Sequence, residues 1–151
     1  MKISLTAILP RRSRTKTEPT DRLLTDYQER CGRYLPTESV VYDTEAAFLD
    51  SLDKQPGRTA ATVILLDSRG QQLSSEEFAT RLGSFRDSGT QRVILAVGPA
   101  DGWSSEARTR ASLLLSFGRI TLPHQLARVI AAEQLYRALT ILAGHPYHSG
   151  H

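Results

Sequence analysis

Cysteine is nearly absent from the sequence, and so is any long apolar run. The single cysteine, Cys31, excludes a disulfide within the chain and is typical of a reducing compartment. It lies in a helical pattern, which favours a place in the core over a reactive role. No apolar stretch approaches the roughly 18 residues needed to cross a bilayer, and residues 1–9 lack the apolar core of a signal peptide. We therefore expect a cytoplasmic protein without a membrane partner, in which residues 1–9 form a first strand.

Several glycine and nucleophile motifs are also missing. The chain has no G-x-G-x-x-G dinucleotide fingerprint, no G-x-x-x-x-G-K-[ST] phosphate loop and no G-x-S-x-G nucleophile elbow. Cys31 has no histidine near it in the sequence. These absences argue against a flavodoxin-like binder of small molecules and against covalent catalysis through a nucleophilic side chain.

Histidine is confined to the last 28 residues, and three of the four histidines are spaced by three in "HPYHSGH". This spacing suggests a metal site, but Pro146 prevents an ordinary helix from carrying the three side chains, and no thiolate or carboxylate stands beside them. We expect no metal, and a polar tail whose side chains face a substrate. The four histidines are His124, His145, His148 and His151.

Lysine is scarce among the basic residues, since 16 of the 19 are arginine, and the net charge is +3. The planar guanidinium suits phosphate and stacks on bases, although an arginine-rich genome explains the composition equally well. One dense cluster, "PRRSRTK" at residues 10–16, is expected to form a loop after the first strand. Such a loop is suited to a phosphate backbone, and an ordinary solvated loop is the alternative.

The 151 residues suit a single domain over 1–151, with a composition that is ordinary for a globular protein. Strand and helix patterns alternate along the chain, which predicts an α/β fold with a parallel sheet and helices on both faces. The expected strands cover 3–9, 39–43, 61–67, 92–97 and 118–122, and the expected helices cover 20–34, 45–53, the segment between Ser74 and Gly89, 104–116 and 124–143.

Two of these helices carry clear local signals. Ser74 and Glu77 predict a capping box at the start of one helix, and Gly89 predicts its end. The helix at 20–34 is expected to be capped by Thr20 or Asp21. Its apolar face contains Leu23, Leu24, Tyr27, Cys31 and Tyr34.

Ligands of parallel sheets bind at the carboxyl ends of the strands. Here those ends are expected at "LLDSRG" (65–70), "VGPADG" (97–102) and "ITLPH" (120–124). Gly98 and Gly102 flank one strand-to-helix turn and would let the backbone approach a ligand closely, although plain turns use the same residue.

Three longer stretches resemble a known family. They are "VILLDSRGQQLSSEEFA", "VILAVGPADGWS" and the ending "ITLPHQLARVIAAEQLYRALTILAGHPYH". Together they resemble the ribosomal large-subunit pseudouridine N3-methyltransferase family, a branch of the SPOUT methyltransferases. The resemblance covers residues 61–151 well and the first 60 residues by length and pattern only.

The resemblance implies a fold, an activity and partners. The fold is a dimeric α/β SPOUT domain with a C-terminal trefoil knot over about 92–143. The activity is methylation of N3 of a pseudouridine in the helix 69 loop of 23S rRNA, on assembled ribosomes, with S-adenosyl-L-methionine as cofactor. By position, the implied cofactor-binding residues are Leu66, Gly98, Gly102, Phe117, Gly118, Arg119, Ile120, Thr121 and Leu122. One departure is Pro99, which stands where the family has a second glycine and has no N–H to donate.

The resemblance also implies roles for the end of the chain. The homodimer would form through residues 104–116 and 124–143, which explains why the last helix is apolar on more than one side. A central helix buried within one subunit is the alternative. The tail would lie near the partner's cofactor pocket. The catalytic candidates are His145, Tyr147, His148 and Arg137. A non-catalytic RNA- or ribosome-binding module that has lost the cofactor remains the second reading of the function.

Overall fold

The computed structural model describes residues 1–14, 19–54 and 59–149. Within them, five parallel strands form one sheet in the order β2-β1-β4-β3-β5, which confirms the α/β class. The strands are β1 (Lys2–Ile8), β2 (Thr37–Tyr42), β3 (Thr62–Gln72), β4 (Arg92–Val97) and β5 (Leu113–Ser116). The helices are α1 (Pro19–Gly32), α2 (Glu45–Asp53), α3 (Ser75–Asp87), α4 (Ser105–Arg110) and α5 (His124–Leu142), and a 3-10 turn, η1, covers Arg11–Ser13.

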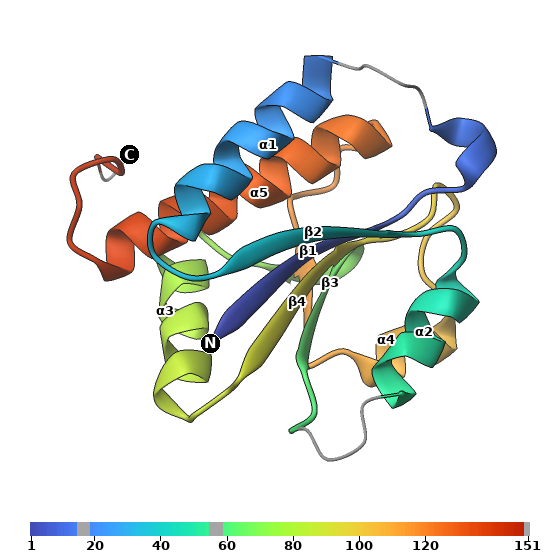
Figure 1. Ribbon diagram of the computed structural model, residues 1–151, viewed down its shortest axis with the longest axis horizontal. Coiled ribbons are helices and arrows are strands. Elements are labelled where there is room, and N and C mark those ends of the chain that lie inside the picture. Colours follow the sequence, from blue (N-terminus) through green and yellow to red (C-terminus); the bar gives the residue numbers. More distant parts are fainter. Residues whose placement is uncertain (15–18, 55–58, 150–151) are drawn as a thin grey trace.

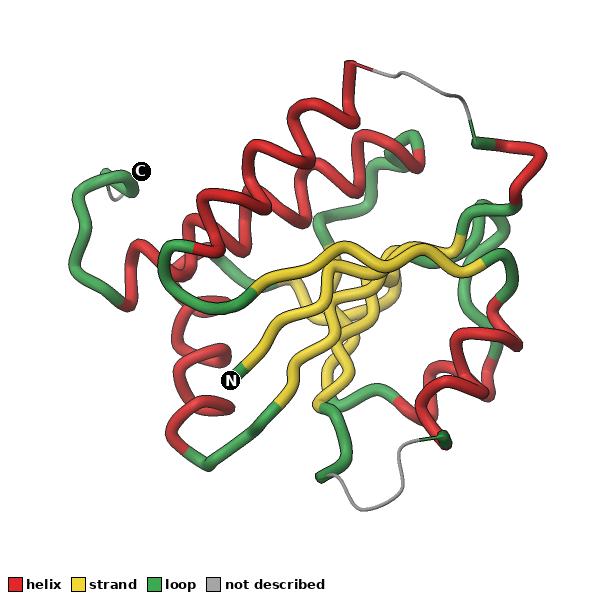
Figure 2. Tube along the Cα trace, viewed as in Figure 1, coloured by secondary structure: helices red, strands yellow, loops and turns green. Residues whose placement is uncertain are grey.

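Helices cover both faces of the sheet, as expected. Helices α1, α5 and α3 lie on one face, and α2 and α4 lie on the other (Figure 1; Figure 2). The central strands divide their side chains between two cores because neighbouring residues of a strand point to opposite faces. Val93 and Leu95 belong to the core under α1 and α5, whereas Ile94 and Ala96 belong to the core under α2 and α4.

Helix α5 is apolar on several sides because it packs against the sheet, α1 and α3 at once. Ala132, Leu135 and Leu139 are each less than 5% exposed. Burial within one subunit therefore accounts for the middle of the helix, which was the alternative to a dimer. The beginning of the helix differs, since Leu126 is 46% exposed, and Ile120 just before it is 82% exposed.

The prediction was wrong between residues 104 and 122. Helix α4 ends at Arg110, and the fifth strand is Leu113–Ser116 rather than 118–122. A short leucine run fits the period of a helix and of a buried strand equally well, so its pattern did not decide between them. Residues 118–122 form an irregular loop, in which Gly118 has a φ of +114°.

The third strand is longer than expected. It was predicted to end at Asp67, but β3 continues to Gln72 beyond a register shift between Leu66 and Gln71. Gly70 allows this continuation, because a Cβ there would lie 2.5 Å from the backbone carbonyl carbon of Leu114 on β5. The stretch 65–70 is therefore an irregular part of a strand and not a loop.

The local signals were correct in part. The capping box of Ser74 and Glu77 is present, and α3 ends at Asp87, two residues before Gly89. The start of α1 was wrong, because the helix already begins at Pro19 and its supposed caps lie in the first turn. Leu23 on the predicted apolar face is 47% exposed.

Cys31 is fully buried in the core, as its helical pattern indicated. Burial raises the pKa of its thiol to about 12, so it stays protonated and unreactive near neutral pH. Within the described ranges, no helix is long and apolar enough to cross a membrane.

Candidate functional site

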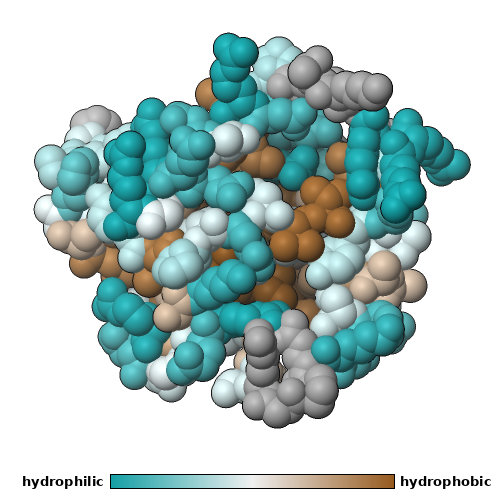
Figure 3. Space-filling model, in the orientation of Figure 1, coloured by the Kyte–Doolittle hydropathy of each residue, from teal (hydrophilic) through white to brown (hydrophobic). Residues whose placement is uncertain are grey.

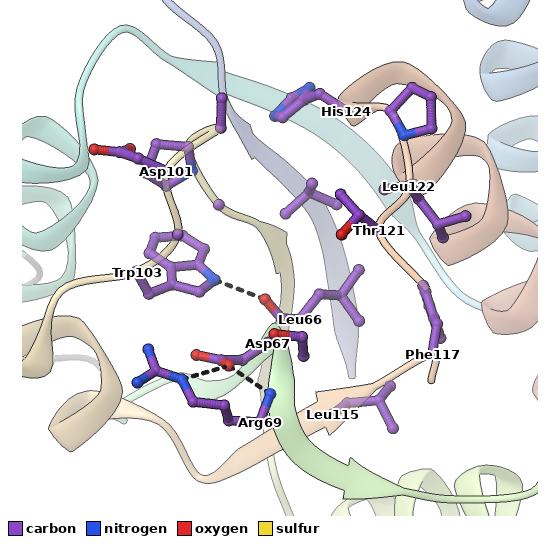
Figure 4. Close-up of a pocket in the computed structure, with 18 of the residues that line it drawn as sticks. Leu66, Asp67, Arg69, Asp101, Trp103, Leu115, Phe117, Thr121, Leu122 and His124 are labelled. Atoms are coloured by element: carbon purple, nitrogen blue, oxygen red, sulfur yellow. Dashed lines mark hydrogen bonds and ion pairs between the residues drawn. The ribbon is translucent and has the colours of Figure 1, made fainter. Parts of the chain in front are cut away.

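A cavity of about 550 Å³ opens at the carboxyl edge of the sheet (Figure 4). It lies between the irregular part of β3, the turn from β4 to α4, the loop after β5 and the first turn of α5. The stretches 65–70, 97–102 and 120–124, which were predicted to lie at the carboxyl ends of strands, thus meet at one site. They do so even though 65–70 is part of a strand and not a loop. The volume is within the range of about 300–1,000 Å³ that small-molecule sites occupy.

The cavity gathers most of the residues singled out from the sequence. Eight of the nine expected cofactor-binding residues line it, namely Leu66, Gly98, Gly102, Phe117, Gly118, Ile120, Thr121 and Leu122. Arg119 does not line it, and its side chain is exposed. The polar or aromatic lining residues that sequence reasoning missed include Asp67, Trp103, Arg108 and His124. The motifs "LLD", "DGW" and "LPH" contained three of them, but no spacing rule marked their side chains.

Trp103 forms one wall of the cavity. Its side chain is buried, and its indole Nε1 donates a hydrogen bond of 2.9 Å to the carbonyl oxygen of Leu66 (Figure 4). The indole lies directly over Gly98, because a Cβ at that position would be 2.7 Å from Cε2 of Trp103. Gly98 was expected to keep space open for a ligand; it keeps space for this ring. Gly102 closes the turn with a φ of +89°, and its N–H donates to the carbonyl of Pro99 at 2.9 Å.

Asp67 and Arg108 form an ion pair in the floor of the cavity. Nε of Arg108 lies 2.7 Å from Oδ2 of Asp67, whose side chain is 5% exposed. The backbone N–H of Arg69 donates to the other carboxylate oxygen at 2.8 Å. Each oxygen of the buried carboxylate therefore has a donor, so Asp67 holds Arg108 and the irregular part of β3 in place.

His124 stands at the first position of α5 and faces the turn after β4 (Figure 4). Both ring nitrogens are buried, and neither has a hydrogen bond of good geometry within the described part of the chain. Burial lowers the pKa of the imidazole, and the nearby charge of Arg128 lowers it further. A neutral ring is the form that this position favours, since the positive end of a helix dipole also disfavours a cation.

A second hollow of about 490 Å³ continues from the cavity. The two share the loop after β5, including Phe117, Gly118 and Leu122. The second hollow extends to the start of α3, where the hydroxyl of Ser75 donates to Oε1 of Gln134 at 2.8 Å.

The four catalytic candidates are not in the cavity of their own chain. Arg137, Tyr147 and His148 form a cluster with Glu133 and Glu76, on the side of α5 next to α3. Glu133 accepts from Nη2 of Arg137 at 2.7 Å and from the hydroxyl of Tyr147 at 2.9 Å. The tail is thus fastened to its own helix, and Tyr147 packs on Tyr136 with ring centroids 4.7 Å apart.

The contacts of this cluster indicate which nitrogen of His148 accepts a hydrogen bond and which one donates. A guanidinium only donates, so Nδ1 of His148, 3.0 Å from Nη1 of Arg137, is the acceptor in this contact. The other nitrogen then carries the proton and donates to Glu76 at 2.7 Å. Burial and the bond to Glu133 raise the pKa of Tyr147, so its phenol stays protonated. His145 is exposed, and its Nδ1 accepts from the backbone N–H of Tyr147 at 3.2 Å.

The cavity suits an elongated ligand with a polar and an apolar part. Phe117, Ile120 and Leu122 supply apolar surface, while Asp67, Arg108 and the backbone of the glycine turns supply polar groups. In the described residues, no group of three histidine, cysteine, aspartate or glutamate side chains is placed to hold a metal ion.

Comparisons with known proteins bear on the whole chain. A family model described as "Predicted SPOUT methyltransferase" matches residues 1–148. Two similar proteins are each named "Ribosomal RNA large subunit methyltransferase H". The protein from Koribacter versatilis is 49% identical over 138 residues, covering 91% of this chain and 94% of that protein. The protein from Brucella anthropi is 40% identical over 166 aligned positions, covering 98% of this chain and 99% of that protein.

A solved structure shares the fold. It is the SpoU methyltransferase AviRb from Streptomyces viridochromogenes in complex with the cofactor AdoMet, with a TM-score of 0.52 and 12% sequence identity. The likeness covers 96% of this chain and 58% of that chain, so this chain corresponds to somewhat more than half of the larger protein.

Proposed function

The chain belongs to the SPOUT methyltransferase family, and on this premise we propose that it transfers a methyl group from S-adenosyl-L-methionine to ribosomal RNA of the large subunit. The observation that carries the proposal is that one cavity is lined by eight of the nine residues that the family resemblance implies for the cofactor. The names of the relatives from Koribacter versatilis and Brucella anthropi support the RNA substrate. The acceptor is N3 of a pseudouridine in the helix 69 loop of 23S rRNA, on assembled ribosomes.

The cavity of this chain fits the cofactor. The backbone at Leu66, Gly98 and Gly102 and in the loop 117–122 would hold the adenosine and methionine parts, and Phe117 and Leu122 offer apolar contact to the adenine. Pro99 offers no N–H, so the turn after β4 has to bind through its other backbone groups. Arg108 stays paired with Asp67, which keeps its positive charge from repelling a sulfonium.

Catalysis in this proposal depends on alignment and on removal of one proton. When bound, the cofactor would supply an electrophilic methyl group on its sulfonium. N3 of the pseudouridine, after loss of its imide proton, would bond to that methyl carbon as the carbon–sulfur bond breaks and the neutral thioether leaves. The chain contributes by holding the base in line and by accepting that proton, directly or through water. His148 has both nitrogens engaged, so accepting a proton requires its contact with Arg137 to break. His145 also has its basic nitrogen engaged, since Nδ1 accepts from the backbone N–H of Tyr147 at 3.2 Å. Its side chain is exposed and this contact is longer than that of His148, which favours His145 as the acceptor.

The proposed assembly is a homodimer in which the tail of one subunit approaches the cavity of the other. The exposed apolar side chains of Leu23, Phe117, Ile120 and Leu126 support an interface near the start of α5. The chain would form one domain over 1–151, knotted over about 92–143, and would act in the cytoplasm. Light scattering of the purified protein at micromolar concentration tests the dimer, and a monomer mass would contradict it.

Two measurements test the activity. Isothermal titration calorimetry with S-adenosyl-L-methionine tests the cofactor. A methyl-transfer assay on ribosomes from a strain that lacks the endogenous enzyme tests the substrate, and ribosomes that already carry the modification are the control. Binding without methyl transfer would contradict the assignment of the substrate.

A non-catalytic RNA-binding module is the second candidate. Two observations favour it: Pro99 lacks a donor in the turn after β4, and the Trp103 indole already occupies the carbonyl of Leu66. This candidate predicts that the protein binds ribosomes but gives no heat with the cofactor in the same calorimetric titration.

A further inference from the structure

We propose that the arginines of η1 and of the residue that follows it, Arg11, Arg12 and Arg14, bind the phosphate backbone of the RNA next to the cofactor cavity. This basic segment is distinct from the cavity and from the cluster that Arg137, Tyr147 and His148 form with Glu133 and Glu76. The inference rests on the proposed function, because it names the surface on which the RNA substrate lies.

The position of the segment is the first reason. Strand β1 pairs with β4 up to Ala7 and Val97, so the chain leaves both strands at the same edge of the sheet. The turn after β4 lines the cavity, and the segment begins three residues after the end of β1. The His124 ring lies near the backbone of both Ile8 and Gly98, which joins the two strand ends to the start of α5. RNA lying across the segment therefore passes the mouth of the cavity.

The segment is held in a fixed conformation. Nε of Arg14 donates to the carbonyl of Leu9 at 3.1 Å, and its Nη2 lies 2.7 Å from Oδ1 of Asp43. Nε of Arg11 lies 3.2 Å from the other oxygen of the same carboxylate. A preformed site loses less conformational entropy on binding than a free loop does.

The charges of the segment are only partly compensated. One carboxylate, Asp43, serves two guanidinium groups, and the side chain of Arg11 remains 83% exposed. Arg12 is exposed and has no ion pair with any described residue. The charge of Arg14 also reaches Arg128, a half-buried arginine on α5 whose pKa is lowered by burial. The acidic groups nearby are Asp21, which acts on Arg128, and Asp101, which stands exposed on the cavity wall.

A phosphate backbone is the partner that this chemistry fits. Guanidinium forks bind phosphate oxygens with two parallel hydrogen bonds, and a row of them neutralises a polyanion without reading its sequence. The side chains over η1 are hydrophilic, at the upper right of Figure 3 in the orientation of Figure 1, which suits a polyanion better than the apolar centre of a protein interface. The remaining cation of the sequence cluster, Lys16, lies outside the described residues.

The test compares two double variants of the full-length protein. Arg11→Ala with Arg12→Ala removes two charges from the segment. Arg33→Ala with Arg86→Ala removes two exposed charges near the ends of α1 and α3, at the opposite edge of the sheet. Affinity for ribosomes from the strain without the endogenous enzyme is measured by co-sedimentation at about 50 and about 200 mM salt with constant magnesium, because phosphate contacts weaken with salt. Cofactor affinity is measured by calorimetry on the same samples.

Each phosphate contact contributes a slope of about 0.7–0.9 in log affinity against log salt, which is about threefold over this range. We expect the wild type and the control variant to lose about tenfold more affinity between the two salt concentrations than the segment variant does. Cofactor affinity should be the same in all three. An unchanged salt dependence in the segment variant, or an equal change in the control, would overturn the inference.

The outcome separates this inference from the proposed function. A wild type that fails to bind cofactor or to methylate contradicts the proposed function, whereas the salt dependence of ribosome affinity is measured without either. If the segment variant instead loses affinity for vesicles of anionic phospholipid while its ribosome affinity is unchanged, the segment serves a membrane surface and the inference is wrong.

Discussion

The indole of Trp103, in the turn after β4, donates a hydrogen bond of 2.9 Å to the carbonyl of Leu66 on β3. Leu66 lies at the register shift of β3, and Trp103 lies between β4 and α4. The tryptophan also packs on Phe48 of α2. A single side chain thereby connects the cavity wall to the core on that face of the sheet.

Trp103 should report cofactor binding by its fluorescence. It is the only tryptophan in the chain and lines the cavity, so a ligand there changes the environment of one known fluorophore. We expect the emission to change with a midpoint equal to the calorimetric Kd. Trp103→Phe is the control that should give no signal. A constant emission spectrum at a cofactor concentration that saturates the heat signal would remove Trp103 from the ligand environment.

Gly98→Val should lower both stability and cofactor affinity. The new Cβ would meet the Trp103 ring at 2.7 Å, and overpacking of this kind costs about 1–3 kcal/mol. Urea unfolding gives the free energy, and calorimetry gives the affinity. Gly98→Ala should cost much less free energy of unfolding in a Trp103→Leu background than in the wild type, because the smaller side chain leaves room for the new Cβ. If the losses in free energy of unfolding from the two substitutions simply add, the Trp103 ring is not what excludes a side chain at position 98.

Sequence patterns predicted the sheet and the location of the cavity more reliably than the chemistry in it. The strand 92–97 and the helix 45–53 were predicted to the residue, because each has a clear period and clear ends. The fifth strand was misplaced because Leu113 to Leu115 fits two periods, and its assignment depends on the neighbouring strand β3. The roles of Trp103 and His124 were missed because each depends on a contact with a residue far away in the chain, which no local spacing encodes.

Stability should fall as the pH is lowered below the ordinary pKa of histidine, partly because of His124. Its pKa in the folded protein is below the ordinary histidine value of 6.5, so the unfolded chain takes up the proton first. The contribution of the neutral ring is therefore complete above about pH 6.5 and is lost as the pH falls toward the folded pKa.

The check is urea unfolding at about pH 7.5 and about pH 5.5 for the wild type and for His124→Gln. We expect the variant to lose less free energy of unfolding over this interval. Glu38 and Glu76 have lowered pKa values, so their contributions are lost only below the ordinary range of a carboxyl group, outside this interval. An equal loss in both proteins would mean that His124 charges in the folded state as freely as in the unfolded chain.

Truncation after Gly144 should reduce methyl transfer far more than cofactor binding. It removes the tail histidines and Tyr147, and loss of a general base costs roughly 10²–10⁴-fold in rate. The tail also contributes to the fold, because Tyr147 packs on Tyr136 and donates to Glu133. We therefore also expect a loss of about 1–3 kcal/mol in the free energy of unfolding, because Glu133 and Arg137 lose partners.

Three matched variants separate these effects. Tyr147→Phe keeps the ring and should keep most of the stability, while His145→Asn and His148→Asn each remove one imidazole and leave Tyr147 in place. A truncated protein that methylates ribosomes at the full rate would place the catalytic groups elsewhere in the chain.

The pairing of β1 with β4 has a consequence for how the chain is made. Lys2 pairs with Arg92, so the second residue of the chain has no partner on that side until the ninety-second has been synthesised. At about 5–20 residues per second, the wait is roughly 5–20 s, during which apolar β1 has one edge unpaired. Contacts this distant in sequence also slow folding after release. The sheet therefore assembles late, and the nascent chain has to be protected from aggregation until β4 emerges.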